Sequence, residues 1–321
     1  MGRLRTWVGA LTLAVPVVAG AGPAAAQSTV VIGMPDWPTA KVTANIIARV
    51  AEKTYGMTPM LRPIGTVQLF DAIDRGEVDI HPEIWMPNET VDIRKYTDEL
   101  GTLTLAPARV EATQHICTTP ATVEATGIRR VADLADPAMA AQFDTDGDGR
   151  GEMWIGDFYW SATRIERLRA KSYGYDQSMM LLTMPEDMAM ASVDAAVALG
   201  TPIVFYCYAP HHLFALHDIV QLEEPAHDPS TWHVLSPSED PAWLENSTAA
   251  SAWMASHYHI GYASDLADYH PDLVAFLDKM ALTDEDAEAM SYAIDVEART
   301  PEDVADEWIA QNEDKIAEWT Q

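Results

Sequence analysis

Four tryptophans lie where a loop after a strand would place them, and they offer the most distinctive chemistry of the chain: Trp37, Trp85, Trp154 and Trp160. The polar neighbours of Trp37 and Trp85 suit a lined cleft better than a buried layer, with core packing as the alternative. A methylated ammonium has no N–H to donate, whereas aromatic ring faces attract it by about 0.5–2 kcal/mol each when desolvated. Several rings around one cation would therefore bind it tightly.

A histidine cluster follows the apolar run 202–208, where tyrosines add further ring faces. His211, His212 and His217 could be interpreted as metal ligands. However, adjacent histidines on an extended chain point to opposite sides, and no His-Glu-x-x-His pattern accompanies them. We therefore favour His211 as a hydrogen-bond donor to a ligand.

The segment 144–152 has the spacing of a calcium-binding loop, with aspartates at motif positions 1, 3 and 5 and glycine at 6. The usual bidentate glutamate is replaced by Ile155, so Glu152 or Asp157 would have to complete the shell. The candidate ligands are Asp144, Asp146, Asp148, Glu152 and the carbonyl of Arg150. We predict a structural Ca²⁺ here, and an acidic turn without metal is the alternative.

Motifs for catalysis are absent from the sequence: there is no Gly-x-Ser-x-Gly, no phosphate-binding glycine loop and no GxGxxG. We predict a protein that is not an enzyme and needs no cofactor for activity. A secreted metal-dependent hydrolase, built on the histidines and the acidic loop, is a distant alternative. Cys117 and Cys207 are the only cysteines, and they either form a disulfide or remain two buried thiols.

The elements that would position these residues begin as strand, helix, strand, helix and strand over 30–32, 38–56, 57–64, 67–76 and 78–85. This order predicts a parallel sheet whose ligands bind at the carboxyl ends of the strands. Further on we predict an extended segment over 110–118, a short helix over 128–134, a helical segment within 179–199 and a strand over 202–208. Capping patterns at Thr283 and Thr300 predict two helices in the tail.

Composition excludes several classes of protein. The chain has 321 residues, of which 49 are acidic and 20 basic, for a net charge of −29. Such a chain should repel nucleic acid and anionic lipid. Arg3 and Arg5, an apolar run and small residues before Gln27 predict a signal peptide over 1–26, and no later apolar run is long enough to span a membrane. We therefore predict an exported, soluble, periplasmic protein.

Taken together, these segments resemble the substrate-binding proteins of glycine betaine/proline-type (quaternary amine) ABC transporters. The resemblance rests on the Trp37 loop, on Gly76–Pro87, on the Ala-Pro-His-His segment after Tyr208 and on 305–312, and it spans nearly the whole chain after 1–26. The acidic loop and the Cys-x-Ala-Pro-His-His form are most like the branch that binds trimethylamine N-oxide.

The resemblance implies an α/β, two-lobed periplasmic-binding-protein fold of type II with the ligand in a cleft between lobes. Residues 27–112 would form the first part of lobe 1, 113–208 lobe 2, and 209–321 the return to lobe 1 with the C-terminal helices. By position, the implied aromatic box consists of Trp37, Trp85, Trp160 and Tyr208. Relatives commonly carry tryptophan at the positions of Tyr208 and His212.

The implied ligand is a small methylated amine, either trimethylamine N-oxide or a glycine betaine-like quaternary ammonium compound. Glu83 would complement its positive charge and His211 would contact its oxide or carboxylate end. Choline, carnitine and proline betaine are alternatives. The implied partner is an ABC permease in the inner membrane, although a sensor partner would leave the same sequence, and receptors of this type usually work as monomers.

Overall fold

Residues 29–86 form the alternating strands and helices that the sequence predicts. The computed structural model describes residues 28–237 and 239–321, so the predicted signal peptide over 1–26 lies outside the described residues. The elements are β1 (Thr29–Met34), α1 (Pro38–Tyr55), β2 (Thr58–Pro63), α2 (Thr66–Asp74) and β3 (Ile80–Met86). Both β2 and β3 pair with β1 in parallel, which confirms the predicted parallel sheet.

Helix α1 shows why the sequence folds this way. Pro38 occupies its first turn, where a missing N–H costs nothing. Its apolar residues recur at helical spacing, and Val42, Ile46 and Val50 are all buried. Gly56 ends the helix in the left-handed conformation, with φ 66°, which glycine adopts without strain. The chain is thereby returned to the sheet for β2.

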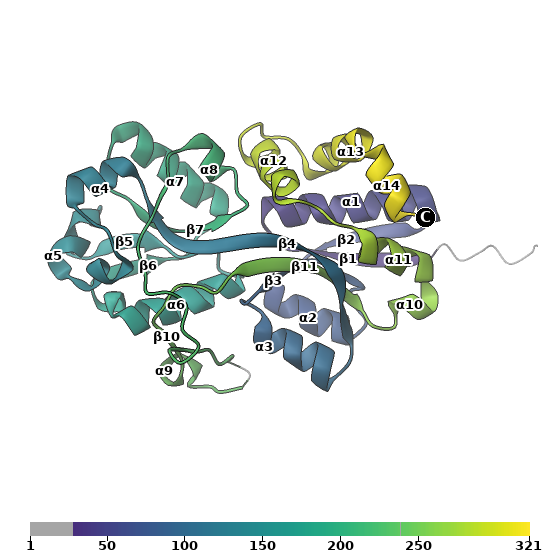
Figure 1. The fold of residues 1–321 in the computed structure, drawn as a ribbon, viewed down its shortest axis with the longest axis horizontal. Helices are drawn as coiled ribbons and strands as arrows, with labels where there is room; N and C mark the ends of the chain where they lie inside the picture. The colour runs from purple at the N-terminus through teal and green to yellow at the C-terminus, as the bar shows by residue number, and fades with distance from the viewer. Residues whose placement is uncertain (1–27, 238) are drawn as a thin grey trace, which may run out of the picture.

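Two long strands join this half to the rest of the molecule. After α3 (Thr90–Ile93) and a π-helical turn over Arg94–Glu99, strand β4 (Leu103–Thr118) runs from the first lobe into the second (Figure 1). Strand β11 (Ser256–Ala263) lies between β3 and β4 and is antiparallel to both. The sequence predicted only 110–118 as extended, and it did not predict β11.

The second lobe is built on the far end of β4. It comprises α4 (Pro120–Thr126), α5 (Pro137–Ala140), β5 (Gly151–Trp154), α6 (Ser161–Tyr173), β6 (Met179–Leu182), α7 (Glu186–Leu199) and β7 (Val204–Ala209), with short 3₁₀ turns over Val131–Ala135, Ala141–Phe143 and Tyr175–Gln177. The strand order of the sheet is β2-β1-β3-β11-β4-β7-β5-β6. Helix α7 confirms the helical segment predicted within 179–199, and the start of that range forms β6. Cys117 and Cys207 form a disulfide between β4 and β7, which decides between the two predicted states.

Residues 213–255 also pack on the second lobe. They contain α8 (Leu213–Leu216), β8 (Val220–Gln221), β9 (Trp232–His233), α9 (Trp243–Asn246) and β10 (Thr248–Ala249). Strand β8 pairs with the end of β4, and Arg169 of α6 forms an ion pair with Glu224 at 2.6 Å. The resemblance implied a return to lobe 1 after residue 208, whereas the chain returns with β11.

The tail covers the first lobe with α10 (Leu266–Tyr269), α11 (Pro271–Lys279), α12 (Asp284–Asp295), α13 (Pro301–Gln311) and α14 (Glu313–Trp319). Figure 1 shows α12 and α13 above α1, on the face of the sheet opposite α2 and α3. Thr283 and Thr300 cap α12 and α13 through their side chains, as the sequence predicts. Among the described residues, no helix is long and apolar enough to cross a membrane.

Candidate functional site

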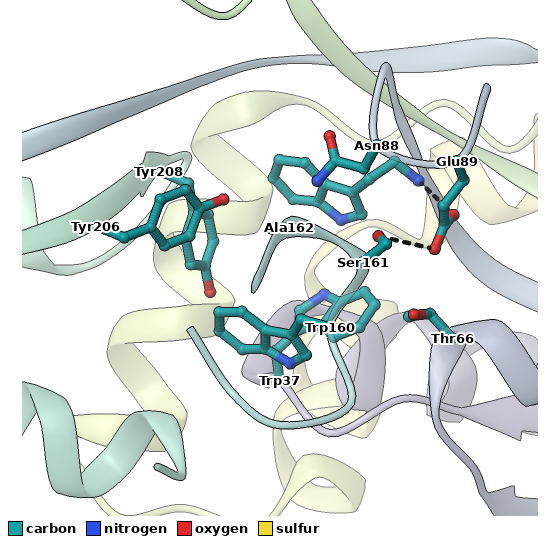
Figure 2. Close-up of a pocket in the computed structure, with 10 residues that line it drawn as sticks. Trp37, Thr66, Asn88, Glu89, Trp160, Ser161, Ala162, Tyr206 and Tyr208 are labelled. Carbon is teal, nitrogen blue, oxygen red and sulfur yellow. Dashed lines mark hydrogen bonds between the residues drawn. The ribbon is translucent and has the colours of Figure 1, made fainter. Parts of the chain in front are cut away.

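A pocket lies at the junction of the two lobes, and each lobe contributes half of its lining residues (Figure 2). The first lobe supplies Trp37, Thr66, Trp85, Asn88 and Glu89, and the second supplies Trp160, Ser161, Ala162, Tyr206 and Tyr208. The four ring residues that the resemblance implied are therefore brought together. Figure 2 shows Tyr206 and Tyr208 on one side and Glu89 and Thr66 on the other.

The four rings contact one another edge to face. Trp37 and Trp160 have ring centroids 6.1 Å apart, and Trp160 and Tyr208 are 5.8 Å apart, with interplanar angles of 85° and 83°. Trp85 meets Tyr208 at 5.5 Å and 85°. In an edge-to-face contact the positive edge of one ring meets the negative face of the other. Any ring face that these contacts leave free could attract a cation.

The ends of secondary-structure elements place these rings. Trp37 is the residue before α1 and follows β1 closely, Trp160 is the residue before α6, and Trp85 and Tyr208 lie near the carboxyl ends of β3 and β7. Trp37, Trp85 and Tyr208 are each less than a tenth exposed, and Trp160 is half-buried. The same rings are therefore packed into the core and line the pocket. Core packing and a position in a cleft do not exclude each other.

Glu83 lies behind the rings and does not line the pocket. Its Oε2 accepts hydrogen bonds from the indole N–H groups of Trp37, at 2.6 Å, and Trp85, at 3.3 Å. Thr39 and Thr43 donate two more. The carboxyl group is fully buried, and this burial raises the pKa of Glu83 to about 7. The sequence analysis expected Glu83 to complement a ligand's charge, and any such effect must pass through the indoles.

His211 also lies behind the pocket, one layer beyond Tyr208. Its Nδ1 accepts the backbone N–H of Leu213 at 3.1 Å, so the ring proton of a neutral imidazole must be on Nε2. That Nε2 is 3.1 Å from Oε1 of Glu186, which also accepts the Tyr208 hydroxyl at 2.6 Å. In this structure both ring nitrogens have protein partners and the ring is not part of the lining, so the contact of His211 with a ligand stays a prediction.

The orientation of the adjacent histidines differs from our expectation. The rings of His211 and His212 lie side by side with centroids 4.2 Å apart, because His212 has helical dihedral angles at the start of α8. His212 approaches Asp295 of α12, at 3.2 Å, and His217 instead pairs with Asp194. His211, His212 and Asp295 could hold a metal together, although Glu186 already occupies Nε2 of His211.

The polar lining was missed by the sequence analysis. Glu89 is buried, and its carboxylate accepts the backbone N–H of Trp85 at 3.2 Å and the hydroxyl of Ser161 at 3.3 Å. Burial, together with the nearby charge of Asp92, raises the pKa of Glu89 to about 8. The carboxyl group is thus largely protonated at neutral pH. A glutamate four residues after a cleft tryptophan was the only signal for it in the sequence.

The acidic loop brings four carboxylates together away from the pocket. Oxygen atoms of Asp144, Asp146, Asp148 and Glu152 all lie within 4.8 Å of one another. Asp144 accepts backbone N–H groups of the loop, and these hydrogen bonds lower the pKa of its carboxyl group. The side chain of Arg150 turns to the backbone carbonyl of Asp176, at 3.0 Å. Ionised carboxylates converging in a turn are ligands that Ca²⁺ accepts.

Comparison with known proteins identifies the family. Residues 28–311 match the family described as the substrate-binding domain of ABC-type glycine betaine transport systems, OpuAC. This chain belongs to that family. The family is one of transport binding domains and not of enzymes. No curated protein matches the chain in sequence.

Solved structures of other binding proteins share the fold at low sequence identity. Lactococcal OpuAC, closed on glycine betaine, is 16% identical, with 92% of this chain and 100% of that chain covered and a TM-score of 0.68. A glycine betaine/L-proline-binding protein, ProX, from Borrelia burgdorferi is 17% identical over 92% and 97%, with a TM-score of 0.71. A choline-binding protein in complex with choline is 18% identical over 91% of both chains, with a TM-score of 0.70. These likenesses confirm the two-lobed α/β fold of this substrate-binding domain.

Proposed function

We propose that this protein is the receptor of an ABC importer for a small methylated ammonium compound, trimethylamine N-oxide or a glycine betaine-like ligand. The observation that carries the proposal is the pocket at the lobe junction, which Trp37, Trp85, Trp160 and Tyr208 enclose from both lobes. Each ring would contribute about 0.5–2 kcal/mol to holding the N-methyl groups. Solved relatives in complex with glycine betaine and with choline support this ligand class.

The oxygen end of the ligand would face the polar side of the pocket. Glu89 in its protonated form donates a hydrogen bond, and such a donor suits an N-oxide or a carboxylate oxygen. Ser161 and Ala162 are the first residues of α6, so their backbone N–H groups have no acceptor within the helix. The helix dipole adds partial positive charge at the same place. Choline, carnitine and proline betaine, the alternatives, differ from these ligands mainly at this end.

The lobes would close on the ligand, and the closed form would deliver it to the permease. In this structure the lobes already touch beside the pocket, where Thr66 donates to the carbonyl of Tyr159 at 3.1 Å and Ser161 donates to Glu89. We further propose that the protein acts in the periplasm as a monomer, after export by the signal peptide over 1–26. A sensor partner in place of the permease would use the same closure.

Isothermal titration calorimetry of the protein without residues 1–26 tests the proposal. The ligands are trimethylamine N-oxide, glycine betaine, choline, carnitine and proline betaine, titrated separately under the same conditions. Binding of one of them at micromolar affinity or tighter, about −8 kcal/mol, supports the proposal and identifies the cargo. Absence of heat with all five would contradict it.

We also propose that the acidic loop binds a structural Ca²⁺ through Asp144, Asp146, Asp148 and Glu152, with the carbonyl of Arg150 as a further ligand. The convergence of the four carboxylates supports this site. The loop precedes β5 and the segment that carries Trp160, so the ion would rigidify one wall of the pocket. It would have no catalytic role. Luminescence of Tb³⁺ bound to the loop, displaced by Ca²⁺ and lost in Asp146→Asn, tests the site.

A further inference from the structure

Two carboxylates, those of Glu83 and Glu186, lie directly behind three of the four rings of the box. Glu83 accepts the indole N–H groups of Trp37 and Trp85. Glu186, in the first turn of α7, accepts the Tyr208 hydroxyl. Both glutamates are less than a tenth exposed, and neither is part of the pocket lining. The polar edges of these rings are therefore all bound to carboxylates, while their faces are left for the pocket.

No strong cation neutralises Glu83 within the described part of the chain. Its other donors are the hydroxyls of Thr39 and Thr43, which are uncharged. His81 is next to it, accepting the Glu83 backbone N–H, but burial lowers the pKa of His81 to about 3 and keeps the ring neutral. A negative charge on Glu83 therefore has the two indoles as its nearest polar partners.

Glu186 has a similar setting on the other side of the box. Its Oε1 is shared by Tyr208 and His211, and no other side chain is hydrogen-bonded to its buried Oε2 among the described residues. The N-terminus of α7 stabilises a negative charge at this position. The hydroxyl of Tyr208 is thus held by a carboxylate.

We propose that Glu83 and Glu186 are specificity-determining residues that make the ring box selective for cations without touching the ligand. This inference rests on the proposed function. A hydrogen bond from a ring N–H or O–H to a carboxylate increases the electron density of the ring and places a negative charge behind it. A cation on the opposite face is attracted by both the ring and the charge, whereas an uncharged ligand of the same shape gains little.

The pocket needs such an indirect source of negative charge because Glu89, the acid in its lining, carries little negative charge itself. The pKa of Glu89 is about 8, which leaves a smaller ionised fraction at pH 7 than the pKa of about 7 leaves for Glu83. An ionised carboxylate inside the pocket would also repel the oxide or carboxylate end of a zwitterionic ligand. Charges behind the rings avoid this conflict, since they act on the methylated end, which the rings surround.

Charge selectivity is the property to measure. Choline is compared with its uncharged carbon analogue 3,3-dimethylbutan-1-ol, and trimethylamine N-oxide with tert-butanol, by calorimetry on wild type, Glu83→Gln and Glu186→Gln. We expect the affinity for the charged ligand to fall on the order of tenfold in Glu83→Gln and by a smaller factor in Glu186→Gln. The affinity for the uncharged analogue should stay within about twofold. Tyr208→Phe, which keeps the ring face, should weaken charged-ligand binding and add nothing to Glu186→Gln.

Glu166→Gln is the control. Glu166 is fully buried, accepts the indole N–H of Trp253 at 2.7 Å and pairs with Arg169 at 2.9 Å, and neither Glu166 nor Trp253 lines the pocket. Its substitution should leave the ratio of charged to uncharged affinity unchanged. Thermal melts show whether each variant folds. If Glu83→Gln does not fold, Glu186→Gln and Tyr208→Phe carry the test. Unchanged selectivity in the folded variants overturns this inference alone, whereas a wild type that binds none of the five ligands tested for the proposed function overturns it together with that function.

Discussion

The hydroxyl of Ser161 donates a hydrogen bond to Oε1 of Glu89 across the junction of the two lobes, with 3.3 Å between the two oxygens. The other carboxyl oxygen accepts the backbone N–H of Trp85. One buried side chain therefore connects the wall of the first lobe to the start of α6 in the second. Its protonation state bears on both stability and ligand contact.

Replacement of Glu89 by glutamine should change the pH dependence of stability. Burial raises the pKa of Glu89 from 4.5 to about 8, so the folded state binds a proton that the unfolded state releases between these values. The stability that this proton contributes is present below pH 4.5 and is lost as pH rises towards 8, by at most about 1.4 kcal/mol per pH unit. The difference in Tm, Glu89→Gln minus wild type, should therefore rise from pH 5 to pH 8. A flat difference would show that Glu89 titrates normally.

Removal of a ring from the box should lower the affinity for the ligand, while the protein still folds. For Trp85→Ala we expect a loss of affinity of about tenfold to a hundredfold, because the variant loses both a cation–π contact and apolar burial. Tyr258 stacks on the other face of Trp85 at 5.0 Å and should limit collapse of the site. Calorimetry measures the affinity, and Tyr159→Ala, at an exposed ring outside the pocket lining, is the control. Wild-type affinity in Trp85→Ala would show that the box is not the binding site.

The disulfide should stabilise the second lobe. It joins cysteines separated by 90 residues, and a closed loop of this size is expected to contribute about 2–4 kcal/mol. The double variant Cys117→Ala with Cys207→Ala should therefore unfold at a lower urea concentration. Wild type in reducing agent should shift in the same direction, whereas the double variant should not respond to it. Equal midpoints for all three samples would contradict a disulfide.

Calcium should act on stability and not on ligand chemistry. Addition of Ca²⁺ to chelator-treated protein should raise Tm, since an ion that binds only the folded state stabilises it by mass action. Asp146→Asn should abolish this shift and leave ligand affinity within about threefold. The comparison uses differential scanning calorimetry with Mg²⁺ as the ionic control. An equal effect of both ions, or a shift that persists in the variant, would contradict a specific loop site.

Local patterns were enough to predict the first sheet and the caps. Apolar periodicity predicts the first five elements, β1, α1, β2, α2 and β3, and Pro38 and Gly56 mark the ends of α1. Capping by Thr283 and Thr300 depends only on the helices that they begin. β11 escaped prediction because its insertion between β3 and β4 depends on partners more than 130 residues away, and its sequence, SHYHIGYA, lacks clean alternation. The length of β4 depends on the same pairing.

The site divides in a similar way. The four rings were predicted because large aromatic side chains at strand and helix ends reach a cleft whichever neighbours they have. Glu83 and His211 are of the right type and close in sequence to the rings, yet they lie one layer behind them. Their positions are decided by contacts with Trp37, Glu186 and Leu213, which sequence spacing does not specify. Glu89 was missed because its place four residues after Trp85 is a weak signal and its contact with Ser161 depends on the other lobe.

The position of the ligand's methyl groups tests the central claim most directly. Proton NMR of trimethylamine N-oxide, glycine betaine and choline in the presence of the protein reports the environment of the N-methyl protons. Ring faces shift such protons upfield, so we expect an upfield-shifted bound resonance for the ligand that binds, together with nuclear Overhauser effects to tryptophan ring protons. Both signals should be lost in Trp85→Ala. Binding without an upfield shift would contradict an aromatic box around a methylated ammonium.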